Sequence, residues 1–502
     1  MTETSSGTLF SAGEAAGMIG GACRGNLEAL IRDVVADSRK AGPGSLFVAL
    51  PGENADGHDF IAMALKRGAS CVLAAAARKA SILSALGPEG PGAACLIFVG
   101  SPLAGLQSLA REHRRRMKGL LRIGITGSSG KTTTKECVGA ALGTSYAAGT
   151  LAMNEGNLNS DIGLALSMFS LRTSHRAGVF EMGMNRKGEM DELASIYEPD
   201  IAVITNIGTA HVGMLGSRQA IAEEKKKIFS RFSGTQTGLV WEDDPYRDFL
   251  KANVSGRVSE FGFRSTRGLE DVRSLGLAGW KLRWSGLDLT FPLPGKHNLL
   301  NGLAALSVAS ELNLAPTLVV RGLSSVKPLF GRSEVFSGRI SLLRDCYNSN
   351  PDSVAAAMDL CDSVECAGRK AFVLGSMLEL GDASLPEHAA MGRKAASSGA
   401  EALFFFGEEA KASFDAAMEA SSVSPANLRP GRTIFHTNDI ESLKAKVLGY
   451  LGDGDLVLAK ASRGLALERL TDALFDAGFV DRDSRSVRAA DSGDSKEAVH
   501  AS

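Results

Sequence analysis

The fold of the middle of the chain is decided by the stretch Leu121-Arg122-Ile123-Gly124-Ile125-Thr126-Gly127-Ser128-Ser129-Gly130-Lys131-Thr132-Thr133. An apolar strand runs from Leu121 to Ile125, a glycine-rich turn follows, and a helical pattern begins near Lys131. In such a turn, backbone N–H groups wrap a polyphosphate, and the N-terminus of the helix adds partial positive charge. The stretch predicts an ATP or GTP site whose phosphate-binding residues are Gly127, Ser128, Ser129, Gly130, Lys131, Thr132 and Thr133.

The turn departs from the full P-loop pattern G-x-x-x-x-G-K-[ST] at one position, because Ile125 stands where the first glycine would be. The core G-x-x-G-K-T is intact, and so is its context between strand and helix. In this pattern Lys131 neutralises the β- and γ-phosphates, and the hydroxyl of Thr132 can bind Mg²⁺.

Two later strands end in residues that could complete a metal site. The apolar run 177–180 leads directly into Glu181, and the strand 201–204 opens into a polar loop that reaches His211. Magnesium prefers oxygen ligands, so a carboxylate at a strand end suits it. A lone histidine is more often structural, so His211 becomes a candidate ligand only in combination with its neighbours.

Length and composition limit the class of protein. At roughly 150 residues per domain, 502 residues suggest about three domains. With 55 Lys and Arg against 56 Asp and Glu, the net charge of −1 gives no global electrostatic case for nucleic acid or an anionic membrane. No apolar run reaches the ~18–20 residues of a membrane span, and the first 23 residues lack the basic residues of a signal peptide. Seven scattered cysteines without a C-x-x-C pair argue against disulfides or zinc. We expect a reduced, cytoplasmic protein.

The pattern along the chain predicts an α/β protein of three domains and a tail. Residues 1–99 would form a small mixed α/β domain, and residues 100–331 the central P-loop ATPase domain. Strands near 371–375, 402–406, 433–436 and 455–459 alternate with helices, which predicts a parallel, Rossmann-like sheet for 332–480. Within the central domain, alternation over 280–291 predicts a hairpin turning at Ser285-Gly286. The basic run 114–116 is expected to be a solvated helix end, and residues 481–502 a disordered tail.

Several blocks, taken together and in order, resemble the ATP-dependent Mur ligases. Besides the P-loop these are Glu181-Met182-Gly183-Met184-Asn185, Thr205-Asn206-Ile207-Gly208 with His211, and Gly295-Lys296-His297-Asn298 with Asn301. The segments Asp37-Ser38-Arg39 and Asp56-Gly57-His58 resemble the UDP-sugar-binding domain of the tripeptide-stage members. The blocks Asp345-Cys346-Tyr347-Asn348-Ser349-Asn350-Pro351-Asp352-Ser353 and Leu374-Gly375-Ser376-Met377-Leu378-Glu379-Leu380-Gly381 resemble the member that adds a dipeptide.

The resemblance implies an amide-forming ligase. ATP would phosphorylate the terminal carboxylate of UDP-N-acetylmuramoyl-tripeptide, and the amine of D-alanyl-D-alanine would attack the acyl phosphate, releasing ADP and phosphate. The chemistry agrees with the residues, because an amide forms from a carboxylate in water only after activation, and lysine and Mg²⁺ stabilise charge on a transferring phosphoryl group. The implied partners are these small molecules, with a monomer as the default state.

The resemblance also implies a catalytic set of Lys131, Glu181, His211 and Lys225. Two Mg²⁺ ions would be bound by Thr132, Glu181, His211 and Lys225, the last as a carbamylated lysine. Three lysines stand together at 225–227, and the register of the apolar residues selects Lys225. For Lys226 and Lys227 we expect a routine salt-bridged helix face, with Glu223 four residues before Lys227.

The remaining implied contacts lie in all three domains. Nucleotide contacts are expected at Asn298, Arg332, Asp345, Tyr347 and Asn348, and substrate contacts at Ser38, Asn157, Asn159, Asn350, Lys460, Ser462 and Arg463. Closure of the third domain about a hinge near residue 331 would assemble the site. The sequence departs from the family pattern at Asn154, Ser160 and Ser376, which puts fine substrate contacts in doubt.

Three alternatives remain to be weighed. The nearest is the preceding Mur ligase, which adds the third amino acid, but its Asp-Asn-Pro-Arg-like motif is missing. Folate polyglutamylation shares the ATPase core, and the UDP-type N-terminal segments argue against it. A nucleotide-gated interaction protein would not need Glu181, His211 and Lys225 together. The third residue of the tripeptide is left open.

Overall fold

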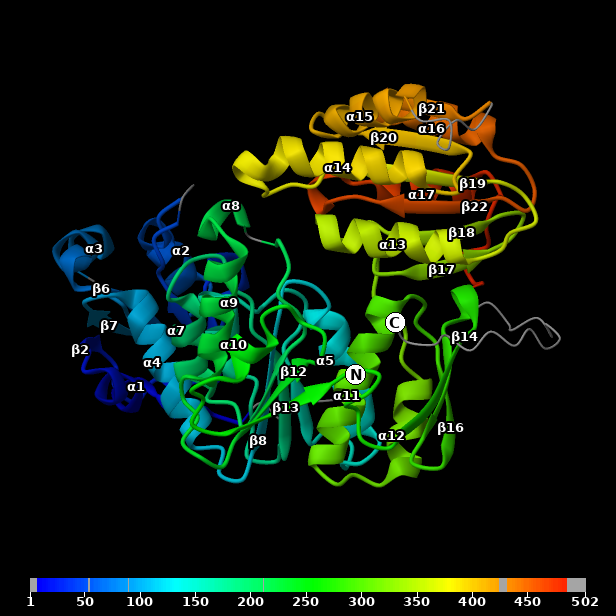
Figure 1. Cartoon of the computed structure of the whole chain (residues 1–502). Coiled ribbons are helices and arrows are strands. Elements are labelled where there is room, and N and C mark those ends of the chain that lie inside the picture. The colour runs from blue at the N-terminus through cyan, green and yellow to red at the C-terminus, as the bar shows by residue number, and fades with distance from the viewer. Residues whose placement is uncertain (1–6, 53–54, 89, 211, 424–430, 485–502) are drawn as a thin grey trace.

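The computed structural model describes residues 7–52, 55–88, 90–210, 212–423 and 431–484. Three α/β units follow one another along the chain, each built on its own sheet (Figure 1). The first is blue, the second runs from cyan to green, and the third, from yellow to red, lies above the second. This confirms the predicted α/β class with three units. Within the described ranges, no helix is long and apolar enough to cross a membrane.

The first unit has a five-stranded sheet in the order β2-β7-β6-β5-β4, parallel except for the edge strand β2. Its strands are β2 (Ala22–Gly25), β4 (Asp33–Val35), β5 (Ser45–Val48), β6 (Cys71–Ala75) and β7 (Cys95–Val99), with a separate antiparallel pair β1 (Phe10–Ser11) and β3 (Leu30–Ile31). Its helices are α1 (Ala12–Ile19), α2 (Ile61–Lys66), α3 (Lys79–Leu86) and α4 (Pro102–Arg115).

The second unit is built on six parallel strands in the order β13-β12-β11-β8-β10-β9. They are β8 (Leu121–Thr126), β9 (Leu151–Met153), β10 (Ala177–Glu181), β11 (Ile201–Ile204), β12 (Thr237–Trp241) and β13 (Arg257–Phe261). The helices are α5 (Lys131–Gly143), α6 (Asp161–Met168), α7 (Glu189–Tyr197), α8 (Val212–Leu215), α9 (Arg218–Lys226), α10 (Arg247–Lys251), α11 (Lys296–Glu311) and α12 (Pro316–Ser324). P-loop and α5 follow the central strand β8, as predicted.

A three-stranded antiparallel sheet extends the second unit: β14 (Leu269–Ser274), β15 (Trp280–Trp284) and β16 (Leu287–Phe291). The predicted hairpin is confirmed, since Trp284 pairs with Leu287 across the turn. Ser285 and Gly286 both have positive φ, 51° and 76°. That geometry suits the right-handed twist of two strands joined by a two-residue turn.

The third unit has the sheet order β17-β18-β22-β19-β20-β21, in which only the edge strand β17 is antiparallel. Its strands are β17 (Glu334–Ser337), β18 (Ser341–Asp345), β19 (Lys370–Gly375), β20 (Ala402–Phe406), β21 (Thr433–Thr437) and β22 (Leu456–Lys460). The helices are α13 (Pro351–Ser363), α14 (Ser384–Ser397), α15 (Ala410–Val423), α16 (Ile440–Tyr450) and α17 (Glu468–Asp476). The four predicted parallel strands are all present.

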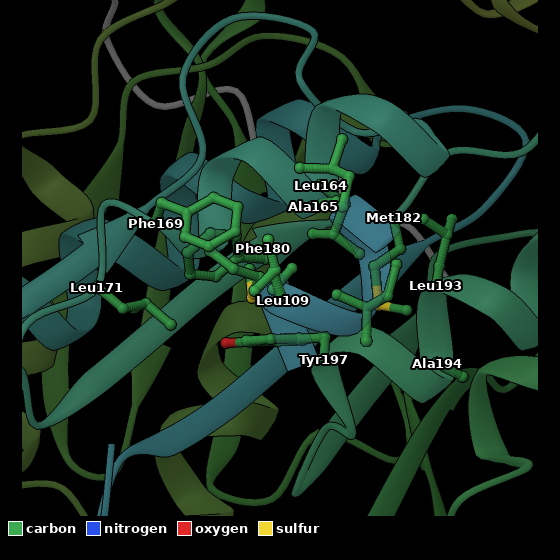
Figure 2. Packing of buried hydrophobic residues seen from close by; sticks show 14 of the residues in the cluster. Leu109, Leu164, Ala165, Phe169, Leu171, Phe180, Met182, Leu193, Ala194 and Tyr197 are labelled. Atoms are coloured by element: carbon green, nitrogen blue, oxygen red, sulfur yellow. The ribbon is translucent and has the colours of Figure 1, made fainter. Parts of the chain in front are cut away.

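One hydrophobic core joins the first unit to the second. Leu109 of α4 packs with apolar side chains of α6, β10 and α7, among them Leu164, Phe180 and Tyr197, as Figure 2 shows. The hydroxyl of Tyr197, buried among them, donates to the carbonyl of Gly178 at 2.7 Å. Helix α4 therefore covers its own sheet and the helical layer of the P-loop sheet at once.

The basic run at the end of α4 is only partly solvated, which corrects the expectation for this helix end. Arg114 is buried, and its Nη1 donates to Glu198 Oε2 at 2.7 Å while its Nε donates to the carbonyl of Ile196 at 3.0 Å. Arg115 and Arg116 are exposed. The difference arises because α4 ends against α7 of the second unit.

The expected tail is described only over its first four residues. The N–H of Asp481 donates to the carbonyl of Ser337 at 3.0 Å, and the N–H of Ser337 donates to Ser484 Oγ at 2.9 Å. These contacts continue along the edge strand β17. Residues 485–502 lie outside the described residues.

The contact between α14 and α15 gives a stability prediction. A Cβ added at Gly392 would lie 2.0 Å from the carbonyl oxygen of Ser413, so Gly392→Ala forces the helices apart. We expect it to lower the free energy of unfolding by about 1–3 kcal/mol, measured by urea denaturation. Gly449→Ala, on α16 with open space around it, is the matched control and should be neutral or stabilising by up to about 1 kcal/mol. Equal effects of the two variants would contradict this packing.

Candidate active site

The site lies at the carboxyl ends of three adjacent parallel strands, β8, β10 and β11. Ile125 pairs with Glu181 across β8 and β10, and Thr126 pairs with Ile204 across β8 and β11. Because parallel strands bring their carboxyl ends to one edge of a sheet, ligands of open α/β sheets bind there. The P-loop, the Glu181 segment and the loop after Ile204 therefore converge although they are far apart in sequence.

Two glycines allow this convergence. A Cβ at Gly127 would lie 1.8 Å from Thr205 Oγ1, and one at Gly130 would lie 2.4 Å from Asn301 Oδ1. Both have positive φ, 150° and 79°, which disfavours any other residue. The loop after β11 and helix α11 thus approach the P-loop backbone directly.

The loop after β11 holds the P-loop through hydrogen bonds. Thr205 Oγ1 donates to the carbonyl of Ser129 at 2.5 Å, and the N–H of Ser129 donates to Asn206 Oδ1 at 2.9 Å. Ser128 Oγ accepts from the N–H of Gly208 at 2.9 Å. These bonds fix the backbone that would receive phosphate.

Two lysines meet at one carbonyl oxygen. Lys131 Nζ donates to the carbonyl of Gly127 at 2.9 Å, and Lys225 Nζ donates to the same oxygen at 3.0 Å. Lys225, on α9, is fully buried. Burial and the neighbouring charge of Lys131 lower the pKa of Lys225 well below its usual value, and burial also lowers the pKa of Lys131.

Thr132 and Glu181 form the part of the site that suits a magnesium ion. Thr132 Oγ1 donates to Glu181 Oε2 at 2.8 Å, and both side chains are buried. The described residues contain no group of three or more His, Cys, Asp or Glu that could hold a metal. Magnesium is typically bound by one or two carboxylates together with waters and phosphates, so a hydroxyl beside one carboxylate is the donor set it takes at a nucleotide. These two residues fit the ion.

His211 lies outside the described residues, but the loop leading to it is held firmly. Asp244 Oδ2 accepts from the N–H of Ile207 at 2.7 Å, and Arg218 Nη2 donates to the carbonyl of Ile207 at 2.8 Å. Asp244 is buried. Sequence reasoning missed this pair, although the acidic run 242–244 directly after a strand was a usable signal.

The expected salt-bridged helix face is confirmed only in part for the other two lysines, because Lys226 is half-buried and binds main-chain carbonyls instead of a carboxylate. Lys226 donates to the carbonyls of Phe249 and Ala252. Lys227 pairs with Glu224 at 2.7 Å rather than with Glu223. The reason is that α9 ends at Lys226, so the residue three positions back faces Lys227 at the turn that follows.

The expected nucleotide residues lie in two places. Asn298, buried at the start of α11, donates to the carbonyl of Pro294 at 2.8 Å, close to Asn301 and the P-loop. Arg332 lies over the ring of Tyr347 at 4.2 Å from its centre. Thr133 and Arg332 line the same small cleft. The second unit and the start of the third unit therefore both contribute residues to the expected nucleotide-binding region.

A buried charge pair supports the same loop from the third sheet. Lys460 Nζ donates to Asp345 Oδ2 at 2.7 Å and to the carbonyl of Asn348 at 3.1 Å. Asp345 Oδ1 also accepts from the N–H of Ser333 at 3.2 Å. Asp345 and Lys460 therefore form an ion pair with each other. The charged group of each of these two expected ligand-binding residues is thus already paired in this structure.

The third unit touches the P-loop directly. Asn350 Nδ2 donates to Ser129 Oγ at 3.0 Å, and Asp352 Oδ2 accepts from the N–H of Thr209 at 3.0 Å. Asn350 also caps α13 through the N–H of Ser353. In the connecting segment, Gly331 and Ser333 have positive φ, 64° and 50°. The segment expected to be a hinge thus includes a non-glycine residue in a sparsely populated conformation.

The expected substrate residues are dispersed. Asn159 Nδ2 reaches the site and donates to Glu181 Oε1 at 2.7 Å, while Asn157 is exposed on the same loop. Ser38 is buried on the first unit, away from the P-loop sheet. Ser462 Oγ accepts from the N–H of Leu378, and Arg463 is exposed beside Glu468.

The three departures from the family pattern have structural roles. Ser160 caps α6 by accepting from the N–H of Gly163 at 3.2 Å. Ser376, fully buried, accepts from the N–H of Ala410 at 3.1 Å at the start of α15. Asn154 bonds to the main chain of Glu181. The contact of Asn154 with Glu181 could not be predicted from the spacing of residues in the sequence. The same is true of the contacts that Asn206 and Asn301 make with the P-loop.

The arrangement can bind a nucleoside triphosphate and hold a metal ion beside its phosphates. Backbone N–H groups, Lys131, Thr132 and Glu181 supply the groups that phosphoryl transfer requires. Asn350 and Asp352 bring the third unit to the edge of this phosphate site.

Comparisons with known proteins agree across all three units. Residues 125–309 match the Mur ligase middle domain, residues 331–463 the Mur ligase, glutamate ligase domain, and residues 30–111 the Mur ligase family, catalytic domain. A relative from Treponema pallidum, UDP-N-acetylmuramoyl-tripeptide–D-alanyl-D-alanine ligase, is 42% identical over 86% of this chain and 92% of its own. MurF from Acinetobacter baumannii superposes with a TM-score of 0.81 at 26% identity, covering 93% and 99%. MurF from Thermotoga maritima in complex with ADP gives 0.73 at 26% identity, covering 88% and 97%.

The contacts of the third unit with the P-loop and with the loop after β11 predict how the units move. Asp352→Ala removes an exposed charge-assisted hydrogen bond, which should cost the closed arrangement about 1 kcal/mol, a roughly five-fold shift toward open forms. Small-angle scattering without nucleotide should then give a larger radius of gyration than the wild type.

Asp359→Ala is the matched control, since Asp359 lies on the same helix and pairs with Lys394 instead. Addition of nucleotide and both substrates should make the wild type more compact. Identical wild-type profiles with and without these ligands would contradict a hinge near residue 331.

Proposed function

Because this chain belongs to the Mur ligase family, we propose that it uses ATP to join D-alanyl-D-alanine to UDP-N-acetylmuramoyl-tripeptide. The product is the pentapeptide precursor of peptidoglycan. The observation that carries this proposal is the similarity over 86% of the chain to a ligase of that name at 42% identity, with the same order of domains. The protein is an ATP-dependent ligase that forms a carbon–nitrogen bond.

The reaction proceeds in two balanced steps. An oxygen of the tripeptide carboxylate attacks the γ-phosphorus of ATP, the bond to the β,γ-bridging oxygen breaks, and ADP leaves. The amine of the dipeptide then attacks the acyl carbon, phosphate leaves with the former carboxylate oxygen, and the amine loses a proton. Lys131 and the N–H groups of the P-loop hold the phosphates, and closure of the third unit excludes water.

The proposed metal ligands are Thr132 and Glu181, with His211 for a second ion. Bound Mg²⁺ would neutralise charge on the transferring phosphoryl group. Support for the first site comes from the pair formed by Thr132 Oγ1 and Glu181 Oε2, which are 2.8 Å apart. Asn298, Arg332, Asp345, Tyr347 and Asn348 are proposed nucleotide contacts, and the substrate contacts are Ser38, Asn157, Asn159, Asn350, Lys460, Ser462 and Arg463.

Lys225 is proposed to be carbamylated, which turns an amine into a carboxylate-like ligand. Only a neutral amine reacts with CO₂, and burial with the repulsion from Lys131 favours the neutral form of Lys225. Carbamylation would also place an anion beside the ammonium of Lys131, which a protonated Lys225 would repel.

Two features favour this reaction over the alternatives. The block 347–351 matches the dipeptide-adding members, and no Asp-Asn-Pro-Arg-like motif for a free amino acid is present in the sequence. The UDP-type segments of the first unit argue against folate polyglutamylation. We further propose that the protein acts as a monomer in the cytoplasm, where nucleotide-linked precursors and ATP are available.

The substrate assignment is tested by measuring ADP release. We expect release that depends on both UDP-N-acetylmuramoyl-tripeptide and D-alanyl-D-alanine, with ordinary turnover of about 1–10³ s⁻¹. Single amino acids with the dipeptide-stage acceptor, and folates with glutamate, are the comparison reactions. Release that ignores D-alanyl-D-alanine would exclude the proposed reaction.

The role of Lys225 is tested by substitution and rescue. Lys225→Ala should lower dipeptide-dependent ADP release by about 100-fold or more, and short carboxylic acids should restore part of it by filling the site. Lys227→Ala is the matched control and should retain activity within about two-fold, because its half-exposed side chain pairs only at a helix end. Normal activity of unrescued Lys225→Ala would exclude the assignment.

A further inference from the structure

The main chain of Glu181 is held by the side chain of Asn154. The N–H of Glu181 donates to Asn154 Oδ1 at 2.9 Å, and Asn154 Nδ2 donates to the carbonyl of Glu181 at 3.1 Å. Asn154 Nδ2 also donates to the carbonyl of Leu158 at 2.9 Å. Asn154 is buried, and these are the three hydrogen bonds that its amide makes with the described residues.

The side-chain amide of Asn154 continues the pairing along β10 beyond the point where β9 ends. The pairing of β9 with β10 ends at Met153 and Val179, two residues before Glu181. Beyond that point the side-chain amide of Asn154 offers one donor and one acceptor, the same groups that a peptide unit offers. It therefore extends the ladder to the residue that carries the metal-binding carboxylate, where an unpaired buried main chain would be costly.

Lys135 links this clamp to the helix of the P-loop. Its Nζ donates to the main-chain carbonyl of Asn154 at 2.6 Å, and its side chain is buried. A Cβ at Gly139 would lie 2.5 Å from Met153 Sδ, so α5 approaches the end of β9 closely. Thr132 stands one turn before Lys135 on the same helix. Helix α5 is thus joined to Glu181 twice, through Thr132 and through Lys135 and Asn154.

We propose that Asn154 and Lys135 are positioning residues that set the separation of Thr132 Oγ1 from the Glu181 carboxylate and thereby the affinity for Mg²⁺ with nucleotide. This inference rests on the proposed function only in taking these two groups as the ligands of Mg²⁺. Asn159 holds the other carboxylate oxygen, Oε1, at 2.7 Å. Main chain and carboxylate of Glu181 are therefore both oriented before any ligand binds.

A purely structural reading fits Lys135 less well. A buried ammonium loses hydration, and an apolar side chain of the same length would fill the space without that cost. Its ion pair with Glu136, at 3.3 Å, is with a partly exposed carboxylate. Holding one carbonyl in place, on the residue that clamps Glu181, gives the charge a function.

The test measures binding rather than turnover. Affinity for a fluorescent ADP is measured in EDTA and over a series of Mg²⁺ concentrations. Asn154→Leu has similar volume without the amide, and we expect its half-saturating Mg²⁺ concentration to rise about ten-fold or more, because loss of groups that orient metal ligands costs 10–100-fold. Affinity in EDTA should stay within about two-fold. Lys135→Met should shift the Mg²⁺ dependence in the same direction, by less.

Two further variants separate positioning from loss of structure. In Asn154→Thr one hydroxyl replaces the two groups that bind Glu181, so an intermediate shift is expected. Thr266→Val is the matched control, since buried Thr266 accepts from the N–H of Gly262 at 3.1 Å in the same unit. It should lower the melting temperature without moving the Mg²⁺ dependence.

Wild-type Mg²⁺ dependence in folded Asn154→Thr and Lys135→Met would overturn the proposal, whether or not Asn154→Leu folds. An equal loss of affinity in EDTA and in Mg²⁺ would also overturn it, because the clamp would then support the nucleotide site generally. The measurement needs no turnover, so a failure of the wild type to ligate the dipeptide would count against the proposed function alone.

Discussion

Two lysines that share the carbonyl of Gly127 set the conditions for the rest of the site. Lys131 and Lys225 approach this oxygen from α5 and α9, at 2.9 and 3.0 Å. Two ammonium groups so close and so poorly hydrated repel each other, and the repulsion is relieved when one amine is neutral or when anions arrive. A neutral lysine and a bound anion at this point are both compatible with a protein that binds a polyphosphate. Glycine is required at 127 because a Cβ there would collide with Thr205 Oγ1 and because its φ is 150°.

Around this point the structure is prepared for a ligand from two sides. The second unit presents a P-loop whose main chain is held by Thr205 and Asn206. It also presents Glu181, whose main chain is held by Asn154 and whose carboxylate is held by Asn159. The third unit presents the N-terminal end of α13, which is joined to the P-loop through Asn350 and to the loop after β11 through Asp352 by partly exposed hydrogen bonds. A phosphate site with a fixed main chain, and a third unit attached to it by exposed bonds, suit a reaction in which substrates must enter before water is excluded.

The elements that the sequence predicted well are those with local signals. Alternating apolar residues and the pair Ser285-Gly286 were enough for the hairpin, and continuous apolar runs for the parallel strands of the third unit. The features that the sequence did not predict depend on contacts with neighbouring strands and helices. Strand β17 is antiparallel to β18, to which a short connection joins it, and Arg114 is buried because α4 ends against α7.

The sequence by itself determined that a phosphate site follows a strand and opens a helix, and that Glu181 and Lys225 are candidates to work with it. Small residues, a lysine and a hydroxyl in fixed order are a local requirement of phosphate binding, so they can be read along the chain. Only the tertiary structure decided that Lys225 meets Lys131 at one oxygen and that Asn154 clamps Glu181. Those contacts depend on strand order and on the close packing of helices that glycines allow, and both are properties of the folded sheet rather than of any segment.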